Sequence, residues 1–318
     1  MNLTVRTYPS VLQLLLILLL LAVPAGHQLM AMESPFIASL SRQVSKYDLQ
    51  VIEGFEQQLL KKFPEAEFGR YFLQKQPQEN SRVLQTIKEQ EPFLLLTLGS
   101  QATHDGLHSI PDVPLVAAMI LNEQVLAGST RATGVLLRFP FEIHIQWLRR
   151  FFPDVDHVNM LYNPLENSKR IDEMIKTAEK SDIAIEAIPV KSVTALPAAL
   201  KSLGRKVGLL LGLPDQTVYS GKTAKAVLLS TFRNRIPFAG LSSSWVKAGA
   251  LYALTRDYKD IGRQCGLIAE KILTGTPVAA IAPVTPDKVL YEINMKTADH
   301  LRLTLDPALI QEATEVYR

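Results

Sequence analysis

The chain is almost devoid of cysteine, and this scarcity limits how it can be stabilised and anchored. Cys265 is the only cysteine among 318 residues, so no intramolecular disulfide can form and stability must come from packing. A lipoprotein needs a cysteine directly after its apolar signal, and none stands there. We therefore expect a protein without disulfides and without a lipid anchor.

An excess of charge of either sign is also absent. The 34 Lys and Arg residues and the 31 Asp and Glu residues are interspersed, leave a net charge of +3, and form no acidic or basic tail. This balance makes no case for a nucleic-acid partner. Apolar residues make up 47% of the chain and low-complexity tracts are missing, which indicates a globular body.

Long hydrophobic runs are missing except near the N-terminus. Residues 11–23 are Leu-rich, follow a short segment with Arg6, and lead into Val23-Pro24-Ala25-Gly26, whose small residues suit a signal peptidase. The run is shorter than the ~20 apolar residues that span a bilayer. We predict a cleavable export signal over residues 1–25, with cleavage after Ala25 or Ala31 left open. An uncleaved anchor is the alternative; either way the rest of the chain works outside the cytoplasm, and we expect a soluble periplasmic protein.

The remaining roughly 290 residues alternate short β-rich runs with longer amphipathic stretches, the pattern of parallel sheets with helical crossovers. The first series predicts strands at 36–38, 67–72, 93–98, 115–118 and 134–137, with helices at 48–63, 79–89 and 101–107. After a helix at 141–152, the second series predicts strands at 158–162, 183–190, 207–211 and 237–239, with helices at 168–181, 193–203 and 217–234. A last section at 250–255, 257–273 and 289–293 is long enough to cross between the two series again.

We therefore predict an α/β fold with two lobes, each a doubly wound parallel sheet flanked by helices, joined by crossover hinges. Residues 33–139 plus 250–284 are expected in lobe 1, and residues 140–249 plus 285–318 in lobe 2. A cleft between the lobes is the implied site.

Polar side chains follow several predicted strands where a helix is about to begin. Ser100, Asn167 and Thr217 occupy equivalent positions in this respect. The N-terminus of a helix favours an anion, so a carboxylate or a phosphate could bind there. The alternative is that each residue only caps its helix, for about 1 kcal/mol. The presence of three such positions around one predicted cleft favours ligand binding over capping alone.

Sequence signatures of catalysis fail on their spacing. Residues 220–223 contain the end of a phosphate-binding loop, but Gln216 stands where that loop needs a glycine. Ser244 and Lys247 match the Ser-x-x-Lys pair of penicillin-recognising enzymes, yet no further motif of that class follows. We therefore predict no catalytic residues.

Two other groups of residues could have either a binding role or a purely structural one. His104 and His108 lie four residues apart, so both imidazoles could face one metal, but no third ligand converges and an exposed helix face is the alternative. Asp257 could hold a ligand ammonium group and Trp245 could cover an apolar side chain; equally, Asp257 caps the following helix and Trp245 packs in the core. We predict neither a metal nor a cofactor.

Several segments resemble the substrate-binding proteins of ABC transporters. They are Val158-Asn159-Met160-Leu161-Tyr162-Asn163-Pro164, residues 207–217, Ile236-Pro237-Phe238-Ala239, Lys247-Ala248-Gly249-Ala250-Leu251, residues 257–264, residues 291–298 and residues 301–305. More narrowly, the chain resembles the branch of type I periplasmic-binding folds with tryptophan- and phenylalanine-binding members, over residues 36–317. The resemblance implies a two-lobed protein that closes around a small solute and presents it to a membrane permease.

The resemblance also implies site residues. In that family the ligand carboxylate is held at the strand end that matches Gly99-Ser100-Gln101. The other implied ligand-binding residues are Ser41 and Tyr47 in the first half, Asn163, Asn167, Asp215, Gln216 and Thr217 in the second lobe, and Ser243, Ser244 and Asp257 near the crossovers. One departure is the Leu121-Asn122-Glu123-Gln124 segment, where many members carry a Thr-Asp-Pro-like turn. Asn122 is included among the candidates, and the ligand class stays open.

We expect a periplasmic substrate-binding component of an ABC transporter that binds an amino acid or a small organic carboxylate by hinge closure. It is expected to be a monomer without enzymatic activity, and its partner an inner-membrane permease. The alternative is an extracytoplasmic sensor or interaction module of the same fold, with a sensor kinase as its partner. A secreted hydrolase is disfavoured because no nucleophile, base and orienting residue assemble from the motifs.

Overall fold

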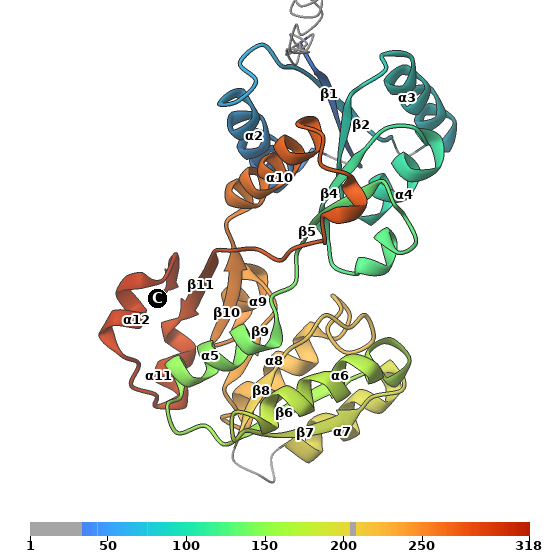
Figure 1. Ribbon diagram of the computed structural model, residues 1–318. Coiled ribbons are helices and arrows are strands. Elements are labelled where there is room, and N and C mark those ends of the chain that lie inside the picture. The colour runs from blue at the N-terminus through green and yellow to red at the C-terminus, as the bar shows by residue number, and fades with distance from the viewer. Residues whose placement is uncertain (1–33, 43, 75, 204–207) are drawn as a thin grey trace, which may run out of the picture.

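Two α/β lobes make up the molecule, as the alternation of strands and helices predicted (Figure 1). The computed structural model describes residues 34–42, 44–74, 76–203 and 208–318. The expected signal at residues 1–25 lies outside the described residues. Among the helices of the described part, none combines the length and the apolar character that crossing a bilayer requires.

The first lobe is built on a parallel sheet of five strands in the order β2-β1-β3-β4-β5. The strands are β1 (Phe36–Ser41), β2 (Glu67–Phe72), β3 (Leu94–Leu98), β4 (Leu115–Ile120) and β5 (Ala132–Leu136). Every residue of the central strand β3 is buried, because helices cover both faces of the sheet. This explains why its sequence is apolar except for the buried Thr97.

Each face of the first sheet has its own helical layer. The helices are α2 (Lys46–Leu60), α3 (Pro77–Glu89), α4 (Ser100–Ser109) and α10 (Tyr258–Leu273), with the 3-10 turns η1 (Glu123–Leu126) and η4 (Val278–Ala280). Helices α2 and α10 bury their apolar sides against one face, while α3 and α4 cover the other. Helix α10 belongs to this lobe although it follows most of the second lobe in sequence (Figure 1).

Helices α2 and α10 touch backbone to backbone, and two glycines permit this. A Cβ atom at Gly54 would lie 2.0 Å from the carbonyl oxygen of Lys259, and one at Gly262 would lie 2.0 Å from that of Val51. Any side chain would therefore separate the helices. The start of α2 is fixed by a capping box, in which Ser45 Oγ accepts from the Asp48 amide at 3.1 Å and the Ser45 amide donates to the Asp48 carboxylate at 3.2 Å.

The second lobe is built on a sheet of seven strands in the order β12-β11-β10-β9-β8-β6-β7. The strands are β6 (His157–Tyr162), β7 (Ala184–Pro189), β8 (Leu209–Leu211), β9 (Phe238–Gly240), β10 (Tyr252–Arg256), β11 (Val289–Asn294) and β12 (Glu315–Tyr317). Among the pairs that these described strands form, only β10–β11 is antiparallel. Because β10 pairs with β9 and β11, residues up to Arg256 belong to this sheet. The expected assignment of residues 250–284 to lobe 1 therefore begins several residues too early.

The helices of the second lobe are α5 (Phe141–Phe151), α6 (Pro164–Glu179), α7 (Leu196–Ser202), α8 (Ala224–Arg233), α9 (Ser243–Ala248), α11 (Met295–Leu301) and α12 (Pro307–Glu312), with the 3-10 turn η2 (Val193–Ala195). An aromatic cluster joins α5 to the sheet: the rings of Phe151 and Tyr252 stack at 3.9 Å, and those of Trp147 and Tyr291 lie 4.4 Å apart. Trp245 packs against Phe238 at 5.6 Å, which agrees with the core alternative for this residue.

The helix predicted over 217–234 begins later than expected, at Ala224. The Asp215 carboxylate accepts hydrogen bonds from the amides of Thr217 and Val218, and Thr223 Oγ1 accepts from the Ser220 amide. These bonds satisfy the backbone of residues 217–223 in turns. Side-chain hydrogen bonding thus replaces the first two helical turns that periodicity suggested.

Candidate ligand-binding site between the lobes

The chain passes between the two sheets at three places in the described part (Figure 1). The first crossing is residues 137–140, between β5 and α5. The second is at Asp257, between β10 and α10. The third is residues 285–288, which lead from the bridge between Val135 and Val284 in the first lobe to β11.

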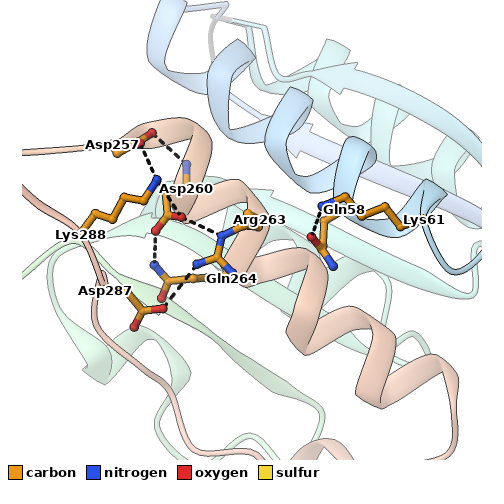
Figure 2. A network of polar contacts seen from close by, with 8 residues as sticks. All are labelled: Gln58, Lys61, Asp257, Asp260, Arg263, Gln264, Asp287 and Lys288. Carbon is orange, nitrogen blue, oxygen red and sulfur yellow. Dashed lines mark hydrogen bonds and ion pairs between the residues drawn. The ribbon is translucent and has the colours of Figure 1, made fainter.

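A network of charged side chains ties the third crossing to the start of α10 (Figure 2). Lys288 lies 3.3 Å from Asp257 and 3.5 Å from the buried Asp260, while Arg263 lies 3.5 Å from Asp287. Asp260 also accepts from Arg263 Nε at 2.7 Å. Burial alone would raise the pKa of Asp260, but the hydrogen bonds and positive charges around it hold that pKa below its ordinary value. The second and third crossings are therefore held together at the first lobe.

A cavity of about 580 Å³ lies between the lobes, and we call it the interlobe cavity. From the first lobe it is lined by Lys46, Tyr47, Gln50 and Tyr258, and from the second lobe mainly by Ser242, Ser243, Ser244, Glu292, Glu315 and Tyr317, with Thr255, Arg256 and Asp257 at the crossing. The rings of Tyr47 and Tyr258 lie 4.5 Å apart. Residues from distant parts of the chain thus share one polar cavity.

Glu292 organises the second-lobe wall of the interlobe cavity. Its carboxylate accepts from Ser243 Oγ at 2.6 Å and from the Tyr317 hydroxyl at 3.0 Å. Burial, together with the carboxylates of Glu292 and Glu315, raises the pKa of Tyr317 to about 12. The tyrosine hydroxyl therefore stays protonated and remains a donor. Asp257 accepts from the Asp260 amide at 2.9 Å as the N-cap of α10, so it serves as a cap while also lining the cavity.

A second cavity, which we call the arginine cavity, lies beside the first crossing. It consists of two hollows of about 260 Å³ and 40 Å³ that share Arg138, Phe139, His144, Arg170 and Met174 as lining residues. Arg256 lines the smaller hollow and also the interlobe cavity. Burial, with the positive charges of Arg170 and Arg256, lowers the pKa of His144 to about 4, so this imidazole is neutral at pH 7.

Four of the residues expected at the site are brought together by the fold. Tyr47, Ser243, Ser244 and Asp257 all line the interlobe cavity. They come from α2, α9 and the second crossing, which are remote in sequence.

A second group of expected residues forms a network within the second lobe. The Asp215 carboxylate accepts from the Asn163 amide at 2.6 Å and from Asn167 Nδ2 at 2.9 Å, and Asn163 Nδ2 donates to Thr217 Oγ1 at 2.7 Å. Asn163, Asn167 and Asp215 are buried, whereas Gln216 is exposed. These side chains bind one another, which gives them a structural role within the lobe. The N-cap of α6 is Asn163, whereas Asn167 lies inside that helix and Thr217 precedes α8 by several residues, so neither is the helix cap that the sequence offered as the alternative.

The remaining expected residues are dispersed over the first lobe. Ser100 and Gln101 are exposed in the first turn of α4, where Gln101 donates to Asp105 at 2.9 Å. Asn122 caps η1 by accepting from the Gln124 amide at 3.0 Å. Ser41 is buried at the end of β1. None of these four lines either cavity of the described residues.

The residues that give both cavities their charge were not predicted from the sequence. Glu292 carried a signal, since it is a charged residue inside the apolar strand β11. No sequence signal marked the three arginines, because arginine is common at such positions. Arg138 lies in a crossing, Arg170 in an amphipathic helix and Arg256 at the end of a strand. Only the fold brings them to one place.

The histidine pair shows no metal geometry. The rings of His104 and His108 stack at 4.1 Å on an exposed face of α4. Among the described residues, no group of three or more His, Cys, Asp or Glu side chains is arranged to hold a metal ion.

Two lobes joined by three crossings, with cavities beside the crossings, define a bilobal solute-binding fold. The sequence model of the family described as ABC transporter substrate binding protein matches residues 50–317. The chain therefore belongs to the ABC transporter substrate-binding protein family. A curated relative, an uncharacterized protein of Rickettsia prowazekii, is 26% identical over 195 residues, which are 61% of this chain and 61% of that protein. This chain thus spans less than two thirds of that relative's length.

Solved structures show the same fold at low sequence identity. The ligand-free, open structure of CD0873 from Clostridium difficile, described as a substrate binding protein with adhesive properties, is 16% identical with a TM-score of 0.75, covering 89% of this chain and 99% of that one. An ABC domain from Streptococcus pneumoniae in complex with L-Trp is 20% identical with a TM-score of 0.59, covering 89% and 100%. A conserved domain protein from Vibrio cholerae is 19% identical with a TM-score of 0.60, again covering 89% and 100%.

Proposed function

We propose that this chain is the periplasmic substrate-binding component of an ABC transporter, and that it binds an amino acid or a small organic carboxylate between its lobes. Family membership supports this role. The observation that carries the proposal is the interlobe cavity, because Tyr47 from the first lobe and Ser243 from the second line the same space. The complex of the Streptococcus pneumoniae neighbour with L-Trp is in line with a solute of this class.

Closure of the lobes is the proposed mechanism. A solute that contacts both walls binds more tightly when the walls approach, and this difference in affinity shifts the population towards a closed state. Rotation about the three crossings needs no change within either sheet. The protein does no covalent chemistry in this scheme; it releases the unchanged solute to an inner-membrane permease. The predicted signal at residues 1–25 would direct a monomer without a lipid anchor to the periplasm.

A thermal-shift screen of the protein without residues 1–25 tests the proposal. Amino acids, organic acids, sugars and nucleosides are added one class at a time. A solute at about 100 times its dissociation constant adds about 2.7 kcal/mol to the free energy of unfolding, which is a measurable rise in Tm. We expect a rise with amino acids or small carboxylates and recovery of the solute unchanged. A flat screen across all classes would contradict solute binding.

A pair of serine variants locates the site. Ser243→Ala removes a hydroxyl from the wall of the interlobe cavity, whereas Ser192→Ala removes an exposed hydroxyl outside both cavities. We expect the solute that raises Tm to bind Ser243→Ala more weakly and Ser192→Ala as it binds the wild type. Equal affinities for all three proteins would move the binding site away from this cavity.

A further inference from the structure

Two of the three arginines at the arginine cavity, Arg170 and Arg256, have no ion-pair partner among the described residues. Arg138 forms an ion pair with Glu123 at 2.5 Å. Arg256 donates through Nε to the carbonyl of Leu137, and its guanidinium lies 4.9 Å from the centre of the Phe139 ring. Neither contact of Arg256 brings a negative charge.

Arg170 is the least compensated of the three. Within the described residues it has no hydrogen-bond or ion-pair partner, only a weaker attraction to Glu173 one turn along α6. Burial, then the charge of Arg138, lowers the pKa of Arg170, while Glu173 acts in the opposite direction. A partly buried guanidinium without a partner is costly to the folded state, and an anion would remove that cost.

The walls of the cavity indicate what kind of anion fits. None of the described residues that line the smaller hollow is acidic; besides the three arginines and His144, the lining is mostly apolar, with Met174, Leu211, Leu213, Leu241 and Leu254. Glu142 and Glu173 line only the larger hollow. An arginine fork matches a carboxylate with two parallel hydrogen bonds, and the apolar walls suit a hydrocarbon body. The smaller hollow offers no carboxylate to an ammonium group.

We propose that the smaller hollow of the arginine cavity binds the carboxylate of a small organic acid that has an apolar body and no amino group beside the carboxylate. The inference rests on the proposed function, since it names the solute class of the same interlobe region. Arg170 supplies the unpartnered guanidinium, Arg138 and Arg256 approach from the first and second crossings, and the leucine side chains contact the hydrocarbon. Arg256 borders the interlobe cavity as well, so the anion would lie where the two cavities meet.

Matched pairs of compounds test this assignment by isothermal titration calorimetry. The probes are 3-phenylpropionate against phenylalanine and 4-methyl-2-oxopentanoate against leucine, with 3-phenylpropionamide as the uncharged analogue and inorganic phosphate as a bare oxyanion. We expect the two organic acids to bind more tightly than the amino acids, the amide and phosphate. Amino acids that bind as tightly as their deaminated partners, or phosphate that binds as tightly as the organic acids, would overturn the proposed class.

Arginine variants test the site itself. Arg170→Gln should weaken binding of the organic acids by about 10- to 100-fold, the usual effect of losing a charged hydrogen bond. It should also raise the Tm of the unliganded protein, because an unpartnered charge is gone. Arg233→Gln, at an exposed position at the end of α8, is the control and should change neither value. Unchanged affinity in Arg170→Gln would overturn the site.

Failure of this inference can be told apart from failure of the proposed function. If amino acids or sugars bind but Arg170→Gln leaves their affinity unchanged and no organic acid binds, solute binding stands and the anion assignment falls. If no compound of any class binds, both fall.

Discussion

At the residue scale, Asp215 holds together two strand ends of the second lobe. It is 5% exposed and accepts from the amides of Asn163, Thr217 and Val218 and from the side chain of Asn167. A buried carboxylate that accepts four hydrogen bonds is part of the framework of the lobe. Family resemblance suggests Asp215 as a ligand contact, but its hydrogen bonds show that it stabilises the structure of the lobe.

Replacing Asp215 should reveal that task. Asp215→Ala leaves four donors without their acceptor, and each buried donor left unsatisfied costs about 1–3 kcal/mol, less where water can enter. We expect a loss on the order of 3 kcal/mol or more in the free energy of unfolding, measured by urea denaturation without added solute. The neighbouring exposed Gln216→Ala is the control and should lose less than about 0.5 kcal/mol. If Asp215→Ala is as stable as Gln216→Ala, the network does not support the fold.

The imidazole of His144 predicts how stability depends on pH. Its pKa is about 4 in the folded protein because of burial and the charges of Arg170 and Arg256, against roughly 6.5 when unfolded. Arg138, Glu142 and Glu173 line the same cavity. Between these pH values the unfolded state binds a proton that the folded state does not, so the stabilisation is complete above about pH 6.5 and is lost as pH falls towards 4.

Urea unfolding at pH 7.5 and pH 5.0 measures this effect. Since glutamine does not titrate, His144→Gln should lose less stability than the wild type over this interval, by on the order of 1–2 kcal/mol. Parallel losses in both proteins would show that the imidazole titrates normally in the folded state.

At the element scale, the contact between α2 and α10 completes the first lobe. Each helix presents a glycine to the backbone of the other, at Gly54 and Gly262, and the surrounding side chains form one buried cluster with the sheet. Cys265 lies in this cluster, and burial raises the pKa of its thiol to about 12, so the thiol is protonated and unreactive. The precision of this helix pair depends on the absence of two side chains.

Adding one methyl group should disturb the helix pair. Gly262→Ala would place a Cβ atom 2.0 Å from the Val51 carbonyl oxygen, so the helices must move apart, at a cost of about 1–3 kcal/mol. A lowered Tm in differential scanning calorimetry is the expected result. Gly221→Ala is the matched control, because no atom lies within 4 Å of its added Cβ. Equal Tm values for the two variants would mean that the helices are not in backbone contact.

At the scale of the whole molecule, three crossings connect the lobes in the described part of the chain, and cavities lie beside these crossings. If solute binding draws them together, the distance between an exposed site on α3 and one at the end of α6 should shorten. Lys88→Cys and Lys180→Cys provide such sites, and the buried Cys265 does not compete for the dyes. We expect energy transfer between the dyes to rise on adding the solute identified by thermal shift. A pair within the first lobe, Lys61→Cys and Lys88→Cys, should show no change; an unchanged signal in both pairs would contradict closure.

The sequence predicted the architecture better than the site. Period-2 and helical patterns, with buried runs such as Leu94–Leu98, fixed the alternation of strands and helices and therefore the two lobes. The sequence could not show that β10 would join the second sheet, because its pairing with β9 and β11 depends on tertiary structure and leaves no local sequence pattern. The charged cavities could not be predicted from the sequence for the same reason. Arg138, Arg170 and Arg256 form no recognisable sequence motif, and only folding brings them close together.

The placement of α10 has a consequence for the order in which the protein can fold during synthesis. The apolar face that β1 and β3 present to α2 stays partly uncovered until residues 258–273 have been made, and the second sheet lacks β11 and β12 until residues 289–317 exist. Neither lobe can therefore fold completely until the C-terminal segments that belong to it have been synthesised. Such long-range contacts slow folding and leave hydrophobic surface exposed meanwhile. A nascent chain of this kind stays incompletely folded, and accessible to chaperones, until its last segments emerge.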